Sequence, residues 1–396
     1  MRTSVLLIVG LAGLILLQTR DASATEFSPE AKFSLLTASP GNELYSVFGH
    51  SALWVYDPVL GIDEVYNWGV FDFDTPNFYL KFLRGKLHYK LAVTSLRAFL
   101  YEYELEGRAV YEQVLNLDQQ QMRDTYRLLM INRRPENIYY LYDFFYDNCA
   151  TRIRDIMYLG VDIDWGPDPH PHRERTFRQM LHPYLDHIPW VAAGIDLVLG
   201  LPSDKRATPW HYMYLPDELF VAFQHARHPD GRLLVDGYDE LIPLRIERSK
   251  AGFVTPLNVS WILLLLGSLS LFSRKIAKRF ASIYMVFLGL LGIPVFFMWF
   301  LSDHVATAMN LNLLWTLPTH IYFIYRAFKK EPGRLPGLYF LSILMVNLLL
   351  LATWSVNPQG FNPAYFPLIG LSAIMAWVLS KHIVFGPDAP ETVTLG

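Results

Sequence analysis

The residue best suited to covalent chemistry in this sequence is its single cysteine, Cys149. It follows Asn148, a residue type that favours the N-cap of a helix, and we predict a helix ending near Leu159 with Gly160 as its stop. The N-terminus of a helix lowers the pKa of a thiol and offers N–H groups to an oxyanion. A lone cysteine on a helix is more often a packing residue, but this position makes Cys149 a candidate nucleophile.

A partner for the thiol is suggested about a hundred residues earlier. His50 stands at the start of an expected strand, and an imidazole beside a thiol lowers its pKa and shuttles the proton. A third polar group usually orients the imidazole, and the next strand offers Asn67 or Asp63. We therefore predict a catalytic group of Cys149 and His50, with Asn67 as the weaker third assignment and Asn148 as the helix cap.

The elements that must position these residues can be read from residue patterns. Residues 51–56 and 64–70 are expected to form a hairpin, because turn-forming residues separate them. Further strands are expected at 86–93 and 108–117, and Asp118 is expected to cap a helix that runs to Asn132. Residues 137–146 are aromatic and expected to pack, while 167–175 read as loop. We predict an α+β domain with a small antiparallel sheet.

The composition places this domain beside a membrane. The chain is 52% hydrophobic, with the excess in the first two dozen residues and after about Thr255. Residues 1–24 are typical of a signal peptide. We expect an exported periplasmic domain at 25–253, a transmembrane helical domain at 254–385 and a cytoplasmic tail at 386–396. The net charge of −3, with no basic stripe in the exported part, argues against a nucleic-acid partner.

The charges around the apolar stretches predict their orientation. Each stretch is near the length that crosses ~30 Å of hydrocarbon, and the first and third connecting loops carry Lys and Arg whereas the second and fourth carry none. This alternation predicts a multi-pass protein of the bacterial inner membrane, with the catalytic domain in the periplasm and the C-terminus in the cytoplasm. The five expected transmembrane helices are 256–273, 281–301, 310–326, 336–354 and 364–384.

Other polar and aromatic groups are also candidate sites. Asp303 and His304 lie in an outer loop, where ionisable groups near a membrane are functional candidates. The aromatic run 139–146 is expected to be core, or else the wall of an acyl-chain groove. Four histidines within eighteen residues could bind zinc, but their spacing follows no closed-site pattern, so we expect neither a metal nor another cofactor. These histidines are His170, His172, His182 and His187.

The His50 strand followed by an Asn-Cys helix start resembles the circularly permuted papain-like (NlpC/P60-related) superfamily, including its lecithin:retinol acyltransferase group. The whole chain more closely resembles the bacterial Lnb-type proteins, in which a periplasmic DUF4105 domain precedes a polytopic membrane region. The stretches that carry this resemblance are 48–52 (FGHSA), 65–73 (VYNWGVFDF), 147–152 (DNCATR), 207–209 (ATP), 214–217 (YLPD), 303–304 (DH) and 312–315 (NLLW).

The resemblance implies a lipoprotein N-acyltransferase. Such an enzyme moves an acyl chain from a phospholipid donor, through a cysteine thioester, to the α-amino group of a diacylglyceryl lipoprotein's N-terminal cysteine. It implies Cys149 as nucleophile and His50 as base, and suggests membrane-side roles of unknown kind for His304 and Trp315. Two alternatives stay open. One is a cysteine hydrolase of the envelope, an amidase or lipase. The other is a non-enzymatic membrane assembly protein in which Cys149 is inert.

Overall fold

The chain divides into two units, each built from three segments. The computed structural model describes residues 26–72, 74–168, 174–247, 252–329 and 333–384, so the predicted signal peptide and cytoplasmic tail lie outside the described residues. Unit 1 holds residues 1–82, 86–174 and 207–248, and unit 2 holds 83–85, 175–206 and 249–396. Residues 175–206, which are part of the predicted exported domain, cluster with the apolar helices in unit 2, and their place in the exported domain stays a prediction.

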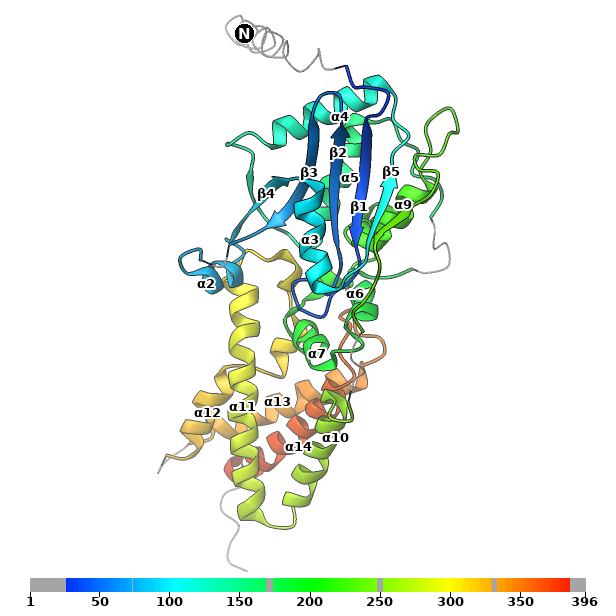
Figure 1. Cartoon of the computed structure of the whole chain (residues 1–396). Coiled ribbons are helices and arrows are strands. Elements are labelled where there is room, and N and C mark those ends of the chain that lie inside the picture. The colour runs from blue at the N-terminus through cyan, green and yellow to red at the C-terminus, as the bar shows by residue number, and fades with distance from the viewer. Residues whose placement is uncertain (1–25, 73, 169–173, 248–251, 330–332, 385–396) are drawn as a thin grey trace, which may run out of the picture. The chain divides into compact units, whose positions relative to one another are not determined.

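Unit 1 is built on one seven-stranded antiparallel sheet in the order β6-β4-β3-β2-β1-β5-β7. Figure 1 shows β4, β3, β2, β1 and β5 of this sheet. The predicted antiparallel sheet is therefore confirmed, and it is larger than expected because β1, β6 and β7 were not predicted as strands. The strands are β1 (Lys32–Ala38), β2 (His50–Asp57), β3 (Ile62–Val70), β4 (His88–Thr94), β5 (Val110–Val114), β6 (Tyr139–Leu141) and β7 (Asp239–Ile242).

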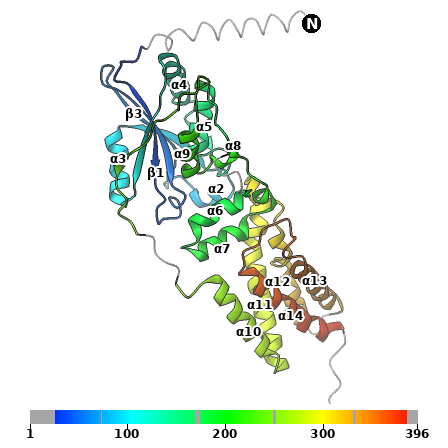
Figure 2. The same ribbon diagram turned by 90° about the vertical axis from the view of Figure 1, so that its right-hand side faces the viewer.

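Each face of the sheet carries its own core, because successive strand residues point to opposite sides. In β1, Leu35 packs in a core shared with α4 (Gln119–Asn132), α5 (Cys149–Gly160) and α9 (Pro216–His225). Its neighbour Leu36 packs on the opposite face, with Phe99 and Tyr103 of α3 (Leu96–Glu106). Figures 1 and 2 both show α3 on one face of the sheet and α5 and α9 on the other.

The two helices predicted from their caps are confirmed. Asp118 caps α4 through a capping box, and Asn148 caps α5 in the same way. Gly160, however, is the last residue of α5 and does not stop the helix in a left-handed conformation. A side chain there would lie 2.9–3.2 Å from Thr125 of α4, so the glycine is required by the close approach of the two helices.

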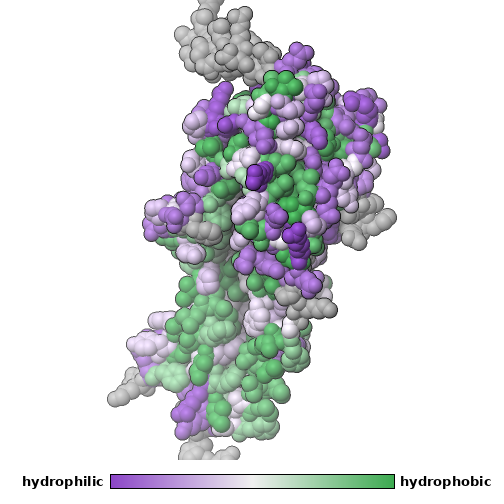
Figure 3. All heavy atoms as spheres, viewed as in Figure 1, coloured by the Kyte–Doolittle hydropathy of each residue, from purple (hydrophilic) through white to green (hydrophobic). Residues whose placement is uncertain are grey.

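Unit 2 has an apolar core and an apolar exterior. Its surface in Figure 3 is mostly hydrophobic, and exposed side chains on three of its helices include Ile262, Leu265, Ile283, Leu290, Met345 and Leu349. Its helices are α6 (Phe177–Leu185), α7 (Pro189–Val198), α10 (Pro256–Ser270), α11 (Arg274–Phe300), α12 (Thr319–Ala327), α13 (Leu335–Ala352) and α14 (Tyr365–Val384). By length and composition, α11 and α13 are able to cross a membrane, and α7, α10 and α14 are shorter apolar helices.

The third expected transmembrane helix, 310–326, is wrong as a continuous helix. The structure describes the whole stretch, and its α-helical part is the nine-residue α12, about 14 Å long at 1.5 Å per residue. Of the preceding residues, Leu311–Leu314 form a short 3₁₀ helix. Asn310 and Asn312 donate to the carbonyl of Leu197 in α7, at 2.8 and 3.1 Å, and so hold this stretch outside a continuous α-helix. The basic residues of the first predicted loop lie instead on the first turns of α11.

A buried ion cluster joins α6 and α7 to the rest of unit 2. Arg178 donates to carboxylates of Asp196 and Asp204 at 3.1 and 2.9 Å, and these three side chains are 2–7% exposed. The second oxygen of Asp196 accepts from Asn362, which lies just before α14. Opposite charges held this way satisfy one another, whereas either alone would be costly to bury.

Candidate active site

The cysteine is positioned by the cap of its helix. Asn148 is 2% exposed and accepts hydrogen bonds from the N–H groups of Ala150 and Thr151, both at 2.9 Å. Its amide nitrogen donates to the carbonyls of Phe144 and Tyr214, both at 2.8 Å. These four bonds fix the start of α5, so the Cys149 side chain has a defined direction toward β2 and β3.

The histidine and asparagine are brought together by neighbouring strands. His50 is the first residue of β2, and its Nε2 lies 2.7 Å from Oδ1 of Asn67 on β3. Because an amide oxygen only accepts, Nε2 carries a proton and Nδ1 is the nitrogen left for the thiol. Asp63, the other candidate, accepts instead from Trp54 Nε1 at 2.9 Å. The structure therefore places Asn67, and not Asp63, in the orienting position.

A local irregularity in β3 shapes this corner of the site. The pairing of β3 with β4 shifts register between Asn67 and Val70, and Gly69 within that bulge has φ +90°. Only glycine adopts that conformation without strain. A side chain at Gly69 would reach to 3.9 Å from the Cys149 Cβ and 4.0 Å from the His50 Cε1, so this position borders the two groups directly.

Cys149 and His50 shift each other's pKa in opposite directions. Burial disfavours the thiolate, but the charge and hydrogen bond of His50, with N–H groups of Ser51 and Ala150, lower the pKa of Cys149 overall. Burial likewise disfavours the imidazolium, but Cys149 and the bond to Asn67 raise the pKa of His50 overall. Each group thus stabilises the charged form of the other, which is the arrangement of an activated thiol nucleophile.

The helix cap limits which N–H groups at the start of α5 can bind an oxyanion. The N–H groups of Ala150 and Thr151 at the helix start are already bonded to the Asn148 side chain. They are therefore poorly placed to receive a new oxyanion, contrary to the expectation that the helix-start amides act together. The N–H of Cys149 itself, at the first position of α5, is the donor that this end of the helix can offer.

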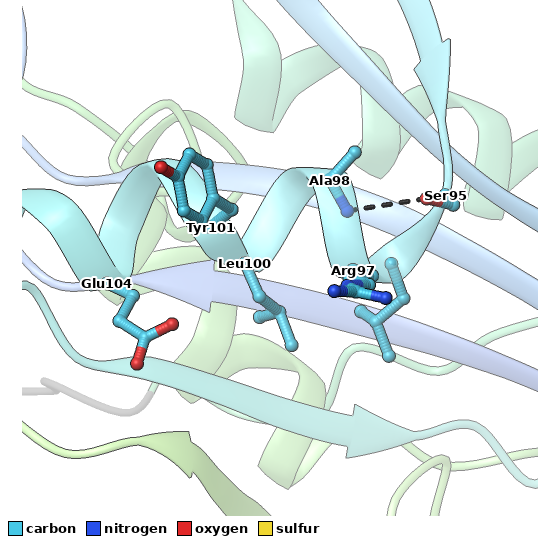
Figure 4. A pocket seen from close by; sticks show the side chains of 7 residues that line it. Ser95, Arg97, Ala98, Leu100, Tyr101 and Glu104 are labelled. Carbon is cyan, nitrogen blue, oxygen red and sulfur yellow. Dashed lines mark hydrogen bonds between the residues drawn. The ribbon is translucent and has the colours of Figure 1, made fainter.

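A cavity of about 330 Å³ opens beside the pair. It is lined by His50, Asn67 and Gly69 together with Tyr45, Ser46, Gly49, Val70, Phe71, Glu102, Tyr103 and Arg108. The last three residues come from α3 and from the chain just after it, and no motif had identified them. A larger hollow on the outer side of α3, lined by Arg97, Tyr101 and Glu104, lacks the catalytic groups (Figure 4).

The aromatic run 139–146 is mixed. Tyr140 and Phe145 are buried, while Tyr139 and Tyr146 are exposed. Tyr142 stacks on Tyr89 at a centroid distance of 4.4 Å and would be 3.8 Å from a side chain at Gly69. The run therefore supplies core as expected, and one of its tyrosines borders the catalytic corner.

The predicted membrane-side residues lie in unit 2. Trp315 is fully buried, donates to Asn312 Oδ1 at 3.1 Å and packs on Tyr365, which favours a structural role. The backbone N–H of Asp303 donates to the Arg84 carbonyl at 3.0 Å. The His304 ring lies close to Gly85, since a Cβ atom at that glycine would be 3.5 Å from the His304 Cε1. A function for Asp303 and His304 stays a prediction.

The four histidines considered as zinc ligands are only partly described. His182 lies 3.3 Å from a carboxylate oxygen of Asp196, which explains its raised pKa, since that hydrogen bond outweighs burial. His170 and His172 lie outside the described residues.

Comparison with known families covers both units. Residues 22–167 match the Lnb N-terminal periplasmic domain, and residues 247–384 match the Lnb transmembrane domain, whose family is named for five transmembrane helices. The chain belongs to the Lnb family. It is thus a membrane protein with a periplasmic N-terminal domain, and His50, Asn67 and Cys149 all fall within that domain. No curated protein and no solved structure matches the chain.

Proposed function

We propose that this Lnb-family protein is a cysteine-dependent acyltransferase that moves a fatty acyl chain from a phospholipid to the α-amino group of a lipidated N-terminal cysteine of a lipoprotein. The observation that carries the proposal is the Cys149–His50–Asn67 arrangement beside a cavity. The chain order, with a histidine strand before a cysteine helix, also supports a circularly permuted papain-like fold for unit 1.

The first half-reaction forms an acyl-enzyme. Nδ1 of His50 takes the proton of Cys149, and the thiolate attacks the ester carbonyl carbon, forming a C–S bond and an oxyanion that the Cys149 N–H receives. Collapse breaks the C–O bond, and the imidazolium of His50 gives its proton to the leaving lysophospholipid. Asn67 holds Nε2–H throughout, so the ring keeps the correct tautomer and direction.

The second half-reaction returns the enzyme to its starting state. The amine of the acceptor attacks the thioester carbonyl, a C–N bond forms, the C–S bond breaks, and His50 takes the proton that the nitrogen loses. Splitting the transfer into two steps lets one nucleophile serve two substrates that do not need to be bound together. Both substrates are lipids, which fits a catalytic domain carried by a transmembrane domain.

We propose that the protein lies in the bacterial inner membrane, with unit 1 in the periplasm and the C-terminus in the cytoplasm. The basic residues at the start of α11 support this orientation, because positive charge stays on the cytoplasmic side. The alternative of an envelope cysteine hydrolase uses the same first half-reaction, with water in place of the amine. A cavity that leaves His50 partly exposed is compatible with either acceptor.

The test is mass spectrometry of the N-terminal lipopeptide of a reporter lipoprotein. Cells depleted of their own N-acyltransferase would express wild type, Cys149→Ala or His50→Ala at matched levels. We expect one added acyl mass with wild type and none with either variant. No added mass from folded, inserted wild type would refute the acyltransferase. Release of free fatty acid that depends on Cys149 would then indicate the hydrolase. A silent Cys149→Ala would indicate a non-enzymatic role.

A further inference from the structure

A buried arginine stands at the edge of the catalytic cavity. Arg108 is 4% exposed and lines the same cavity as His50 and Asn67. Its Nε donates to the Ser39 carbonyl at 2.7 Å, and its Nη1 donates to Glu106 at 2.9 Å. The guanidinium carbon lies 4.8 Å from the ring centre of Tyr103. These contacts fix the plane of the guanidinium beside the cavity.

One nitrogen of this guanidinium has no acceptor. Nη2 of Arg108 is shielded from water and has no hydrogen-bond partner among the described residues. Buried polar groups of proteins are nearly always paired, and a charged donor is the most costly to leave unpaired. An unpaired guanidinium N–H at the wall of a substrate cavity is therefore best explained by an acceptor that arrives with the substrate.

The charges around the cavity are mixed, and Arg108 is the cationic side chain among the residues that line it. Glu102 also lines the cavity, but it is exposed, so solvent and salt weaken its field. Glu106 occupies Nη1 and leaves Nη2 unused. The positive charge of Arg108 acts on His50 and lowers its pKa. Cys149 and Asn67 raise the same pKa by more. Arg108 is thus close enough to act on a group that is bound to the catalytic pair.

We propose that Arg108 recognises the phosphodiester of the acyl donor and so sets the preference of the site for phospholipid over neutral esters. This proposal rests on the acyltransferase function and names the group that selects its donor. A planar guanidinium with a free N–H matches phosphate oxygens, and a charge-assisted bond in a shielded site is strong.

The segment 41–48 borders Arg108, and its residues Tyr45 and Ser46 line the same cavity. A side chain built at Gly41 would lie 3.2 Å from the Arg108 Cδ, so the segment packs against the arginine stem. On the outside it is held by an exposed hydrogen bond of 3.1 Å between the Tyr45 hydroxyl and Glu106. Exposed bonds of this kind contribute little. Because Nη2 is shielded in this structure, a donor phosphate would reach it only after a local shift of the residues around it.

The direct test measures binding in the full-length Cys149→Ala protein in phospholipid-free detergent. The probes are dihexanoyl phosphatidylglycerol, dihexanoylglycerol and inorganic phosphate. We expect the phospholipid to bind at least about tenfold more tightly than the neutral diacylglycerol, from one charge-assisted hydrogen bond. Arg108→Met should abolish that difference, and Arg108→Lys should keep part of it. Arg97→Met, which removes the same charge from the outer side of α3 (Figure 4), should keep all of it.

A second arm measures acyl-thioester formation on Cys149 by intact mass. Arg108→Met should lower kcat/KM about 10- to 100-fold for the phospholipid but less than about 3-fold for p-nitrophenyl hexanoate. Equal losses with both donors, or equal binding of phospholipid and diacylglycerol, would overturn the proposal. Tight binding of inorganic phosphate without a preference for phospholipid would show a free-anion site and overturn it as well. If wild type forms no thioester with either donor, the acyltransferase fails, while the binding arm still decides the role of Arg108.

Discussion

Replacing Asn67 by alanine removes the 2.7 Å hydrogen bond that orients Nε2 of His50. A hydrogen bond to a charged group contributes ~1.5–3 kcal/mol, and each 1.4 kcal/mol is about a factor of ten. We therefore expect the second-order rate of acyl-thioester formation to fall by roughly 10- to 150-fold. The fold should survive, because Asn67 is partly exposed and its loss leaves no buried charge unpaired.

The pH dependence gives a readout that a purely structural role would not move. The reactive ion pair exists above the pKa of Cys149 and below the pKa of His50, the first lowered and the second raised. The bond to Asn67 stabilises the imidazolium, and through it the thiolate. In Asn67→Ala the acid limb should therefore move to higher pH and the alkaline limb to lower pH. Asn67→Asp should move the alkaline limb the other way, because a carboxylate stabilises the imidazolium further.

Two measurements check these limbs. Alkylation of Cys149 by iodoacetamide reports the acid limb whatever the natural substrate is, since only the thiolate reacts. The pH profile of kcat/KM for acyl transfer reports the alkaline limb, where the imidazolium is lost. Asn116→Ala, which removes an amide bonded to the Leu233 carbonyl, is the matched control and should leave both limbs in place. An Asn67→Ala protein with wild-type rates and unshifted limbs would refute the orienting role.

Further predictions concern stability, measured by thermal unfolding of the full chain in detergent. Asn148→Ala should lower the free energy of unfolding by about 2–4 kcal/mol, because it removes a helix cap and leaves buried backbone groups unpaired. Asp118→Ala, at the exposed start of α4, should lower it by only about 1 kcal/mol. Equal losses in the two variants would contradict this reasoning. Gly160→Ala should lower the melting temperature because its new methyl group meets the α4 backbone, and Gly237→Ala, with open space around it, should not; a neutral Gly160→Ala would show that α4 and α5 are not tightly packed. Arg178→Met should lower the free energy of unfolding by about 3–5 kcal/mol, because it leaves the buried carboxylates of Asp196 and Asp204 without their cation. Little change would mean that the cluster is not buried in solution.

The parts of the fold that could be predicted are those encoded by local signals. Asp118 and Asn148 predict the starts of their helices, because short polar side chains accept hydrogen bonds from the free N–H groups there. The hairpin of β2 and β3 follows from alternation and a turn. By contrast β1, an interior strand of the sheet, is buried on both faces at six of its seven positions, so its sequence shows no alternation of apolar and polar residues to detect.

Part of the candidate active site could be predicted from the sequence for a similar reason. Cys149 and His50 could be found because their residue types and positions carry chemistry directly. The orienting residue could be narrowed only to Asn67 or Asp63, because the register of β2 on β3 decides which of them meets the imidazole. That register pairs Asp63 with Tyr56, at the far end of β2 from His50. Arg108 gave no signal at all, since its importance depends on one unpaired nitrogen and a cavity wall assembled from separate segments.

The same holds for the region before α12. Its apolar composition predicted a membrane helix, yet Asn310 and Asn312 bind backbone carbonyls at the end of α7. That pairing joins residues more than a hundred positions apart in the chain. Hydropathy averages over such residues and misses them, because a single buried amide is enough to hold a loop in place where a helix is expected.

The grouping of residues 175–206 with unit 2 has a practical consequence for anyone who wishes to study the catalytic domain alone. A soluble fragment that ends before α10 would carry α6 and α7 without the helices and loops they pack on. Asp196 would lose its bond to Asn362, and the Leu197 carbonyl would lose the two asparagines that pair with it. Such a fragment would expose apolar surface and unpaired polar groups, and we expect it to aggregate. A fragment in which a short flexible linker replaces 175–206 would follow the natural division of the polypeptide.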